Sequence, residues 1–191
     1  MTTIEKIKEY IRFYPDYPKK GVKFIDVLPV LSDAGTFSAL IDELNKNIST
    51  PNIATPEARG FLFGAPLLLL DKVKTLIAFR KNSKLPAAEN DLQKVSIVKE
   101  YGDDSLYFRI SDIEHAHPTN GVIEISIFDD ILATGGTAEG MANHLNALTA
   151  KTPEGVFPVK VKEFVFLAEI SDLKGKERLS KIAPVKSLIS F

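Results

Sequence analysis

One segment constrains the fold of this chain more than any other, because it joins a strand pattern to two acids and a glycine-bearing turn. Residues 122–128 (VIEISIF) predict a buried strand, and Asp129-Asp130 follows it directly. The next seven residues, Ile-Leu-Ala-Thr-Gly-Gly-Thr, predict a short loop that opens a helix over residues 137–150. A strand, a short loop and a helix in this order are typical of open α/β sheets, which bind ligands at the carboxyl ends of their strands.

The rest of the chain alternates helix and strand patterns. Helical spacing predicts a first helix from Thr2 or Thr3 to Tyr14, a second over residues 37–48 and a buried one over residues 61–70. Short apolar runs predict strands at residues 53–54, 75–79, 95–98, 106–110 and 164–168. Residues 15–29 predict a long ordered loop and residues 81–91 a mobile one. This alternation predicts an α/β fold with a mostly parallel central sheet flanked by helices.

Composition narrows the class of protein. A chain of 191 residues suffices for one α/β domain, so we expect residues 1–191 to form a single domain. The net charge of −1 provides no broad field for nucleic acid or acidic lipid. Cysteine is absent, which excludes disulfides, thiol nucleophiles and cysteine-ligated metal. The longest apolar run, residues 65–70, is too short to cross a bilayer, and the N-terminus lacks the apolar core of a signal peptide, so we expect a cytoplasmic protein.

The loop after Asp130 has the features of a phosphate site. Gly135 and Gly136 let the backbone approach an anion, and Thr134 and Thr137 offer hydroxyl donors. Neither the Walker pattern nor the dinucleotide fingerprint is present. Two carboxylates beside such a loop fit a sugar phosphate. The carboxylates would accept hydrogen bonds from the sugar hydroxyls, while the loop holds the phosphate. The alternative is that the two acids only cap a helix, which a lone Asp-Asp pair would favour.

These residues resemble the phosphoribosyl pyrophosphate motif of type I phosphoribosyltransferases, and the wider sequence is similar to the adenine-specific branch of that family. The matching blocks follow the family's order from about Pro15 onwards. They are DYP at 16–18 with Gly21, Phe24 and Asp26, then EARGFLFG at 57–64, RK at 80–81, KLP at 84–86, EYG at 100–102 and LKG at 173–175. The resemblance implies the type I phosphoribosyltransferase fold, with a flexible β-hairpin loop and with residues 1–35 as an N-terminal helix and base-covering hood.

The resemblance also assigns roles to the blocks that bind the activated sugar. Asp129 and Asp130 would bind the ribose hydroxyls, and Ala133, Thr134, Gly135, Gly136 and Thr137 would hold the 5-phosphate. The pyrophosphate would lie against Ala58, Arg59, Arg80, Lys81, Lys84 and Tyr101, with Glu57-Ala58 as a cis peptide. Arginine suits this leaving group because its planar fork matches phosphate oxygens.

Further roles concern the base, the metal and the assembly. Glu100 would be the acid that stabilises or protonates the purine, and Phe24 would stack on adenine while the backbones of Lys23 and Ile25 read its edge. Mg²⁺ would arrive mainly on the pyrophosphate and the ribose hydroxyls, with no dedicated protein metal site. Tyr101 would face the neighbouring site in a homodimer. His115, His117 and His144 lack metal-ligand spacing.

Several positions depart from the family pattern and leave alternatives open. Pro56, Asn82-Ser83, Ile97, Lys99 and Ile25 differ from the usual residues, and residues 152–161 resemble an insertion. Taken alone, Arg80-Lys81 also fits a solvated pair, Phe24 a core aromatic and Glu100 a surface acid. The rival functions are transfer to guanine, xanthine or hypoxanthine, and a non-catalytic phosphoribosyl pyrophosphate sensor, although the chain has no room for a DNA-binding domain.

Overall fold

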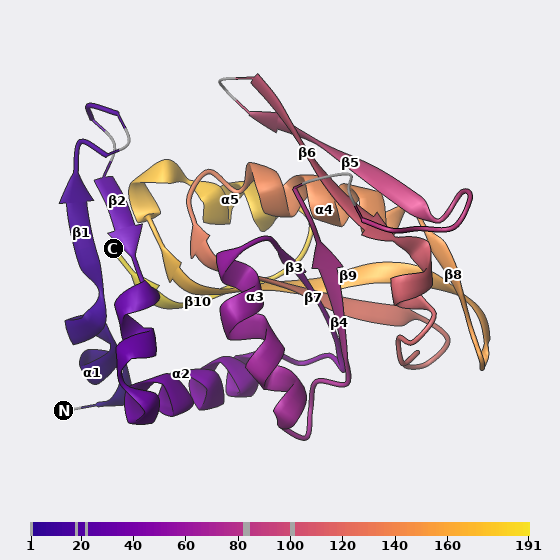
Figure 1. Ribbon diagram of the computed structural model, residues 1–191, viewed down its shortest axis with the longest axis horizontal. Helices are drawn as coiled ribbons and strands as arrows, with labels where there is room; N and C mark the ends of the chain where they lie inside the picture. The colour runs from indigo at the N-terminus through magenta and orange to yellow at the C-terminus, as the bar shows by residue number, and fades with distance from the viewer. Residues whose placement is uncertain (1, 18, 22, 82–84, 100–101) are drawn as a thin grey trace.

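A computed structural model gives the architecture and describes residues 2–17, 19–21, 23–81, 85–99 and 102–191. Its centre is a six-stranded sheet in the order β10 (Val185–Ser190), β9 (Gly155–Glu169), β7 (Ile123–Leu132), β3 (Asn52–Pro56) and β4 (Thr75–Phe79), with β8 (Thr149–Thr152) paired to β9 (Figure 1). The five ordered strands are parallel, and only β8 runs antiparallel in this sheet as described. The predicted mostly parallel sheet is confirmed.

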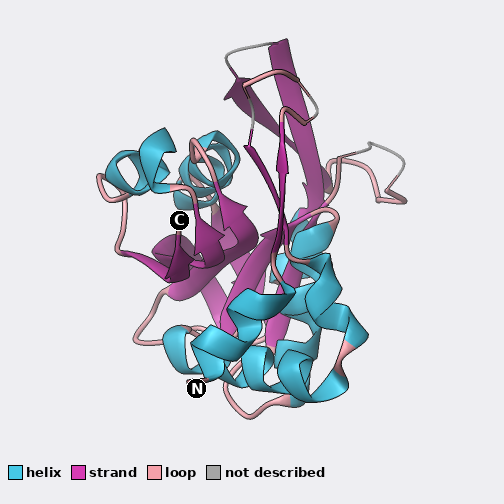
Figure 2. Cartoon of the chain, turned by 90° about the vertical axis from the view of Figure 1, so that its left-hand side faces the viewer, coloured by secondary structure: helices cyan, strands magenta, loops and turns pink. Residues whose placement is uncertain are grey.

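Elements cover both faces of the sheet (Figure 2). One face packs against α1 (Thr3–Tyr10), α2 (Ala34–Asn47) and α3 (Arg59–Gly64). The other packs against α4 (Gly136–Asn146), α5 (Gly175–Leu179) and a hairpin of β5 (Leu92–Lys99) and β6 (Gly102–Arg109). Successive side chains of β9 point to opposite faces of the sheet. Phe164 and Phe166 pack in the core on the α4 side, whereas Val165 and Leu167 pack in the core on the α2 side. The sheet is therefore a middle layer covered on both faces, so a ligand can reach it at the ends of its strands.

Two hairpins rise beyond the carboxyl edge of the sheet (Figure 1). β1 (Arg12–Pro15) and β2 (Lys23–Asp26) pair antiparallel near the N-terminus. The β5–β6 hairpin is anchored to the body by Phe108, whose ring stacks on Phe79 with centroids 4.4 Å apart and meets the His144 ring edge-on at 5.7 Å. Short 3₁₀ turns complete the chain: Leu28–Ser32, Ala65–Leu69, Ile110–Ile113 and Ser171–Leu173.

Several predicted element boundaries were wrong. The first helix is capped by Thr2, one of the two residues predicted to start it, and ends at Tyr10 because Arg12–Pro15 pairs with Lys23–Asp26. This pairing also turns part of the expected 15–29 loop into strand. The helix predicted for residues 137–150 ends at Asn146, since Thr149 and Ala150 pair with β9. Residues 61–70 are not one buried helix: α3 gives way to a 3₁₀ turn, and Leu62, Leu68 and Leu69 are exposed.

Residues 152–161, expected to be an insertion, form the last residue of β8, the turn after it and the first half of β9. None of the helices in the described part of the chain has the length and apolar character that a membrane crossing requires.

Candidate active site

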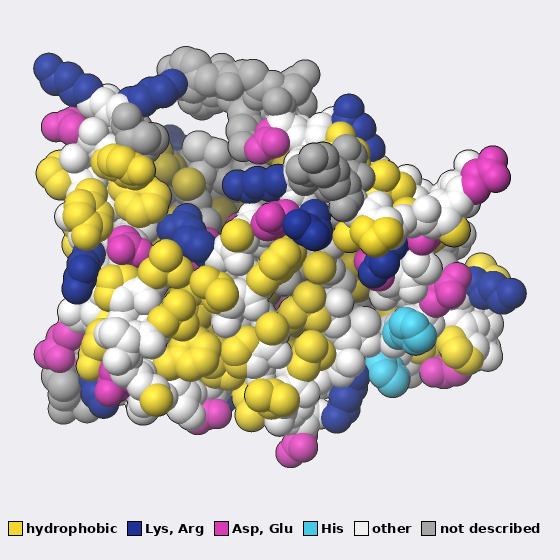
Figure 3. All heavy atoms as spheres, in the orientation of Figure 1, with side chains coloured by type: hydrophobic (Ala, Val, Ile, Leu, Met, Phe, Trp, Pro, Cys, Tyr) yellow, Lys and Arg dark blue, Asp and Glu magenta, His cyan; other side chains and the backbone are white. Residues whose placement is uncertain are grey.

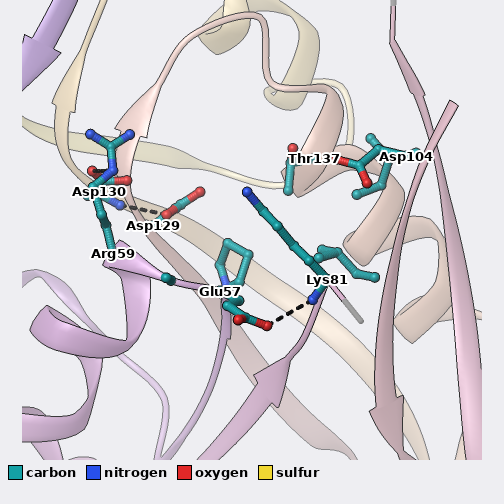
Figure 4. Close-up of a pocket in the computed structure, with 11 residues that line it drawn as sticks. Glu57, Arg59, Lys81, Asp104, Asp129, Asp130 and Thr137 are labelled. Atoms are coloured by element: carbon teal, nitrogen blue, oxygen red, sulfur yellow. Dashed lines mark hydrogen bonds and ion pairs between the residues drawn. The ribbon is translucent and has the colours of Figure 1, made fainter. Parts of the chain in front are cut away.

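A polar pocket lies at the carboxyl ends of β3 and β7, where the order of the sheet places adjacent strand ends side by side (Figure 4). The cavity of about 160 Å³ combines polar residues from five segments with a few apolar ones. Its lining residues are Pro56, Glu57, Ala58, Arg59, Lys81, Ile97, Asp104, Leu106, Asp129, Asp130 and Thr137. Six of the residues predicted to bind the activated sugar therefore share one cavity: Ala58, Arg59, Lys81, Asp129, Asp130 and Thr137.

The acid pair lies near the end of β7, which continues two residues further to Leu132. Asp130 is 3% exposed and pairs with Arg59, whose Nε lies 2.9 Å from the carboxylate Oδ2. Asp129 accepts a hydrogen bond of 2.8 Å from the backbone N–H of Asp130. Burial raises the pKa of Asp129 well above its usual range, and the neighbouring charge of Asp130 raises it further. Burial also raises the pKa of Asp130, although the Arg59 guanidinium opposes that rise.

The turn after β3 fixes the opposite wall of the pocket. The Glu57–Ala58 peptide is cis, as the resemblance implied. The Glu57 carboxylate accepts hydrogen bonds from the Lys81 N–H at 3.0 Å and from Arg80 Nε at 3.2 Å. These bonds, led by that from Lys81, lower the pKa of Glu57. Arg80 is thus engaged with Glu57 at the pocket's edge, whereas the Lys81 side chain extends into the pocket (Figure 4).

The predicted phosphate loop lies directly after β7 and opens α4. Gly135 has φ of +80°, a left-handed conformation that favours glycine, and it caps the helix that begins at Gly136. Thr134 is exposed and Thr137 lines the pocket. Of the loop residues predicted to hold the phosphate, Thr137 shares the cavity with the acids, whereas Ala133, Thr134, Gly135 and Gly136 are not among its lining residues. The first turn of the 11-residue helix that this loop opens has backbone N–H groups without partners inside the helix, as an anion site requires.

Arg59 links this pocket to the N-terminal hairpin. Its guanidinium carbon lies 5.4 Å from the centre of the Phe24 ring, and Nη1 donates to the Ile25 carbonyl at 3.4 Å. Phe24 is half-buried and also meets Tyr17 edge-on at 5.3 Å. The Ile25 side chain is buried, whereas Lys23 is exposed with its ammonium group 4.6 Å from the Phe13 ring centre. The three residues predicted to contact the base thus lie on β2, next to the acid pair's arginine.

Comparisons with known proteins identify the family. A scan against protein-family models found no match. An adenine phosphoribosyltransferase from Thermoanaerobacter pseudethanolicus is 38% identical over 192 residues, covering 99% of each chain, and one from Pelagibacter ubique is 35% identical over 189 residues, covering 97% of each. The chain belongs to the adenine phosphoribosyltransferase family.

Solved structures of adenine phosphoribosyltransferases share the fold. The T. pseudethanolicus enzyme superposes with a TM-score of 0.78 at 37% identity, over 98% of this chain and 99% of that one. The Saccharomyces cerevisiae enzyme, solved with an imino-altritol bisphosphate and adenine, gives a TM-score of 0.75 at 30% identity, over 97% of this chain and 98% of that one. The expected type I phosphoribosyltransferase fold is therefore confirmed.

Two lining residues of this adenine phosphoribosyltransferase pocket were missed from the sequence, Asp104 and Leu106. Both lie on β6, and Asp104 pairs with Ile97 of β5, so the three side chains share one face of the hairpin. Period-2 alternation after Gly102 could have placed them together, but only the fold shows which face meets the pocket. Lys84, Glu100 and Tyr101, also expected at the site, lie outside the described residues.

Proposed function

We propose that this chain transfers the 5-phosphoribosyl group from phosphoribosyl pyrophosphate to adenine, giving AMP and pyrophosphate in purine salvage. The observation that carries the proposal is that Asp129, Asp130 and Thr137 of the first α4 turn line one pocket, in a chain whose relatives are named for this activity. It is a glycosyl transfer, so the protein has to align two substrates and place charge around the sugar.

In this proposal the loop and the acids hold the sugar phosphate. The N–H groups of Ala133, Thr134, Gly135 and Gly136, with the hydroxyl of Thr137, bind the 5-phosphate. Asp129 and Asp130 accept hydrogen bonds from the ribose hydroxyls. The raised pKa of both acids supports this role, because burial is its main cause and hydrogen bonds donated by the sugar hydroxyls would offset the cost of the buried charge.

The pyrophosphate binds on the opposite wall, against Ala58, Arg59, Lys81 and, through the loop that bears it, Lys84. Arg80 orients this wall through Glu57 and contacts the outer phosphate oxygens. Cations on this side stabilise the charge that the leaving group carries as the anomeric C–O bond breaks. The negative field of Asp129 and Asp130 stabilises the positive charge that develops on the sugar.

Magnesium fits the chemistry of this pocket as a substrate-bound ion. Mg²⁺ prefers oxygen ligands from phosphates and water, and the pocket offers carboxylates from Asp129, Asp130 and Asp104 spread over its walls. Across the part of the chain that the structure describes, no three His, Asp or Glu side chains converge as a metal cage. When bound, the ion would neutralise the pyrophosphate and orient it for departure.

Adenine lies in this proposal between β2 and the acid pair, stacked on Phe24. The backbones of Lys23 and Ile25 read its edge, and Arg59 holds the Ile25 carbonyl in place. Adenine presents an amine donor and a ring acceptor, whereas hypoxanthine reverses both, and each buried group left unpaired costs about 1–3 kcal/mol. Glu100 acts as the acid opposite the reacting nitrogen, so Glu100→Gln should lower kcat strongly and leave substrate affinity nearly unchanged.

The assembly proposed is a homodimer in the cytoplasm, with Tyr101 facing the neighbouring site. Leu62, Leu68 and Leu69 are 46%, 42% and 87% exposed on α3 and the turn after it. Hydrophobic side chains gather over this part of the face shown in Figure 3. A second copy covering these leucines would remove the exposed apolar surface from water. Sedimentation velocity of the purified protein tests the dimer, and a monomer at micromolar concentration contradicts it.

A panel of bases tests the reaction itself. Adenine, guanine, hypoxanthine and xanthine are each offered with phosphoribosyl pyrophosphate and Mg²⁺, and pyrophosphate release is measured. Release with adenine alone supports the proposal. Faster release with another purine replaces adenine as the substrate, and no release with any base, despite calorimetric binding of the activated sugar, leaves the sensor alternative.

A further inference from the structure

The turn that begins α5, at Gly175, packs directly against residues 132–133, where the proposed phosphate loop begins. A Cβ atom on Gly175 would overlap the carbonyl oxygen of Ala133 and would lie 2.7 Å from Leu132 Cδ1. Gly175 is buried, and the residue before it, Lys174, has a left-handed φ of 56°. The polypeptide therefore reaches the loop at a distance that only glycine permits.

The contact is reciprocal. A Cβ atom on Gly135, the left-handed residue of the loop, would lie 3.3 Å from the Gly175 carbonyl oxygen and 3.2 Å from Leu179 Cγ. Leu179, on α5, is fully buried. Two glycines thus face each other, one in the loop and one in α5, and each limits the space available to the other.

Further bonds hold the two segments in register. Arg178 of α5 is paired with Glu139 in the first turn of α4, with Nε 2.9 Å from Oε2. The Glu139 N–H donates to the Gly135 carbonyl at 2.9 Å. At the other end of the loop, the Ile170 N–H donates to the Leu132 carbonyl at 2.9 Å. The chain around α5 therefore bonds to both flanks of the loop: Ile170 to Leu132 before it, and Arg178 to Glu139 after it.

We propose that Gly175 is a positioning residue: α5 acts as the template that shapes the 133–137 loop for the sugar phosphate. This rests on the proposed function, in which that loop binds the 5-phosphate. A methyl group at residue 175 would force the Ala133 carbonyl to move by about 1 Å to reach van der Waals contact. A displacement of that size in a positioning group can cost about 100-fold in rate.

The test compares Gly175→Ala with Gly35→Ala. Gly35 is exposed on α2, where a Cβ would make an ordinary contact of 3.6 Å, so this variant controls for glycine replacement in general. Calorimetry uses two probes: ribose 5-phosphate, which requires the loop, and magnesium pyrophosphate, which requires the opposite wall. We expect Gly175→Ala to raise the Kd of ribose 5-phosphate at least 10-fold and that of pyrophosphate less than 2-fold, with no change in Gly35→Ala.

Other outcomes separate the two proposals. Unchanged ribose 5-phosphate affinity in folded Gly175→Ala, or an equal loss for both probes, overturns the positioning role. A parent protein that binds pyrophosphate but not ribose 5-phosphate instead removes the proposed function of the loop. Arg178→Gln, a variant outside the loop, gives a second test: we expect ribose 5-phosphate affinity to fall about 3-fold with pyrophosphate unchanged, and equal weakening of both contradicts the template.

Discussion

Glu163 on β9 and Asp130 on β7 are each buried carboxylates on neighbouring strands, but their surroundings differ. Glu163 accepts hydrogen bonds from the Ser49 N–H at 2.6 Å, from Ser126 Oγ at 2.7 Å and from Lys186 Nζ at 2.7 Å. Burial alone would raise the pKa of Glu163, yet the bonds from Lys186, Ser126 and Ser49 outweigh it and lower the pKa. At the acid pair burial prevails instead: it raises the pKa of Asp129 and Asp130, although the Arg59 guanidinium opposes that rise.

The contrast distinguishes Glu163, an acid that stabilises the fold, from Asp129 and Asp130, the acids proposed to bind substrate. Near the amino ends of β3 and β10, the protein supplies Glu163 with donors from three other segments. At the carboxyl ends, Asp130 pairs with Arg59 and Asp129 accepts from the Asp130 N–H, but burial still raises the pKa of both acids. Buried acids whose internal partners do not offset the cost of burial reduce the stability of the fold, and substrate hydroxyls can supply the missing stabilisation. The two regions should therefore respond to substitution in opposite directions.

The largest effect on stability is expected from Glu163→Ala. The change leaves buried Ser126 and the Ser49 N–H without their acceptor, and losing one partner of such a network costs about 3 kcal/mol. Urea unfolding measures it, with Glu114→Ala as the control, since Glu114 is exposed. If Glu163→Ala lowers the free energy of unfolding no more than the control does, Glu163 does not stabilise the sheet, and the proposed difference between the two acids is wrong.

Asp129→Asn should change stability in the other direction. The amide keeps an acceptor for the Asp130 N–H and removes a charge from a buried, like-charged pair, so we expect a gain of about 0.5–2 kcal/mol at pH 8. Ribose 5-phosphate affinity should fall about 10-fold or more, because a charge-assisted hydrogen bond to the sugar is lost. Calorimetry measures the affinity and urea unfolding the stability of the same sample. A destabilised variant would mean that Asp129, like Glu163, stabilises the fold.

The pH dependence of these effects has opposite signs. Because the pKa of Glu163 is lowered on folding, its stabilisation is present above the unfolded pKa of about 4.3 and is lost as the pH falls through the folded pKa. Because the pKa of Asp129 is raised, its cost is absent below about pH 3.9 and grows as the pH rises towards the folded pKa. Unfolding curves from pH 2 to 8 should show Glu163→Gln approaching the parent below about pH 4, as the pH falls through the lowered folded pKa of Glu163. The same curves should show Asp129→Asn diverging from the parent as the pH rises.

The two regions also differ in how far the sequence predicted them. The acids, the glycines and Thr137 are contiguous, so one local pattern predicted the strand, the loop and the helix that form the carboxyl edge. The partners of Glu163 lie 114, 37 and 23 positions away, and no local pattern joins them. The β1–β2 hairpin was missed for the same reason, because helical spacing continues to Tyr14 while pairing with Lys23–Asp26 overrides it. Long-range pairing, rather than local preference, decided both.

The smallest change that separates the regions is Ser126→Ala. Its hydroxyl lies 2.7 Å from the Glu163 carboxylate and 2.9 Å from Thr50 Oγ1, and it is on the same strand as Asp129. Removing it takes one donor from Glu163 but leaves the Ser49 N–H and Lys186, so we expect a loss of about 1 kcal/mol. Ribose 5-phosphate affinity should stay within about 2-fold, since sites without shared partners act independently. A larger loss of affinity would mean that a change beside Glu163 alters the acid pair through β7. The two regions would then be energetically coupled and not independent.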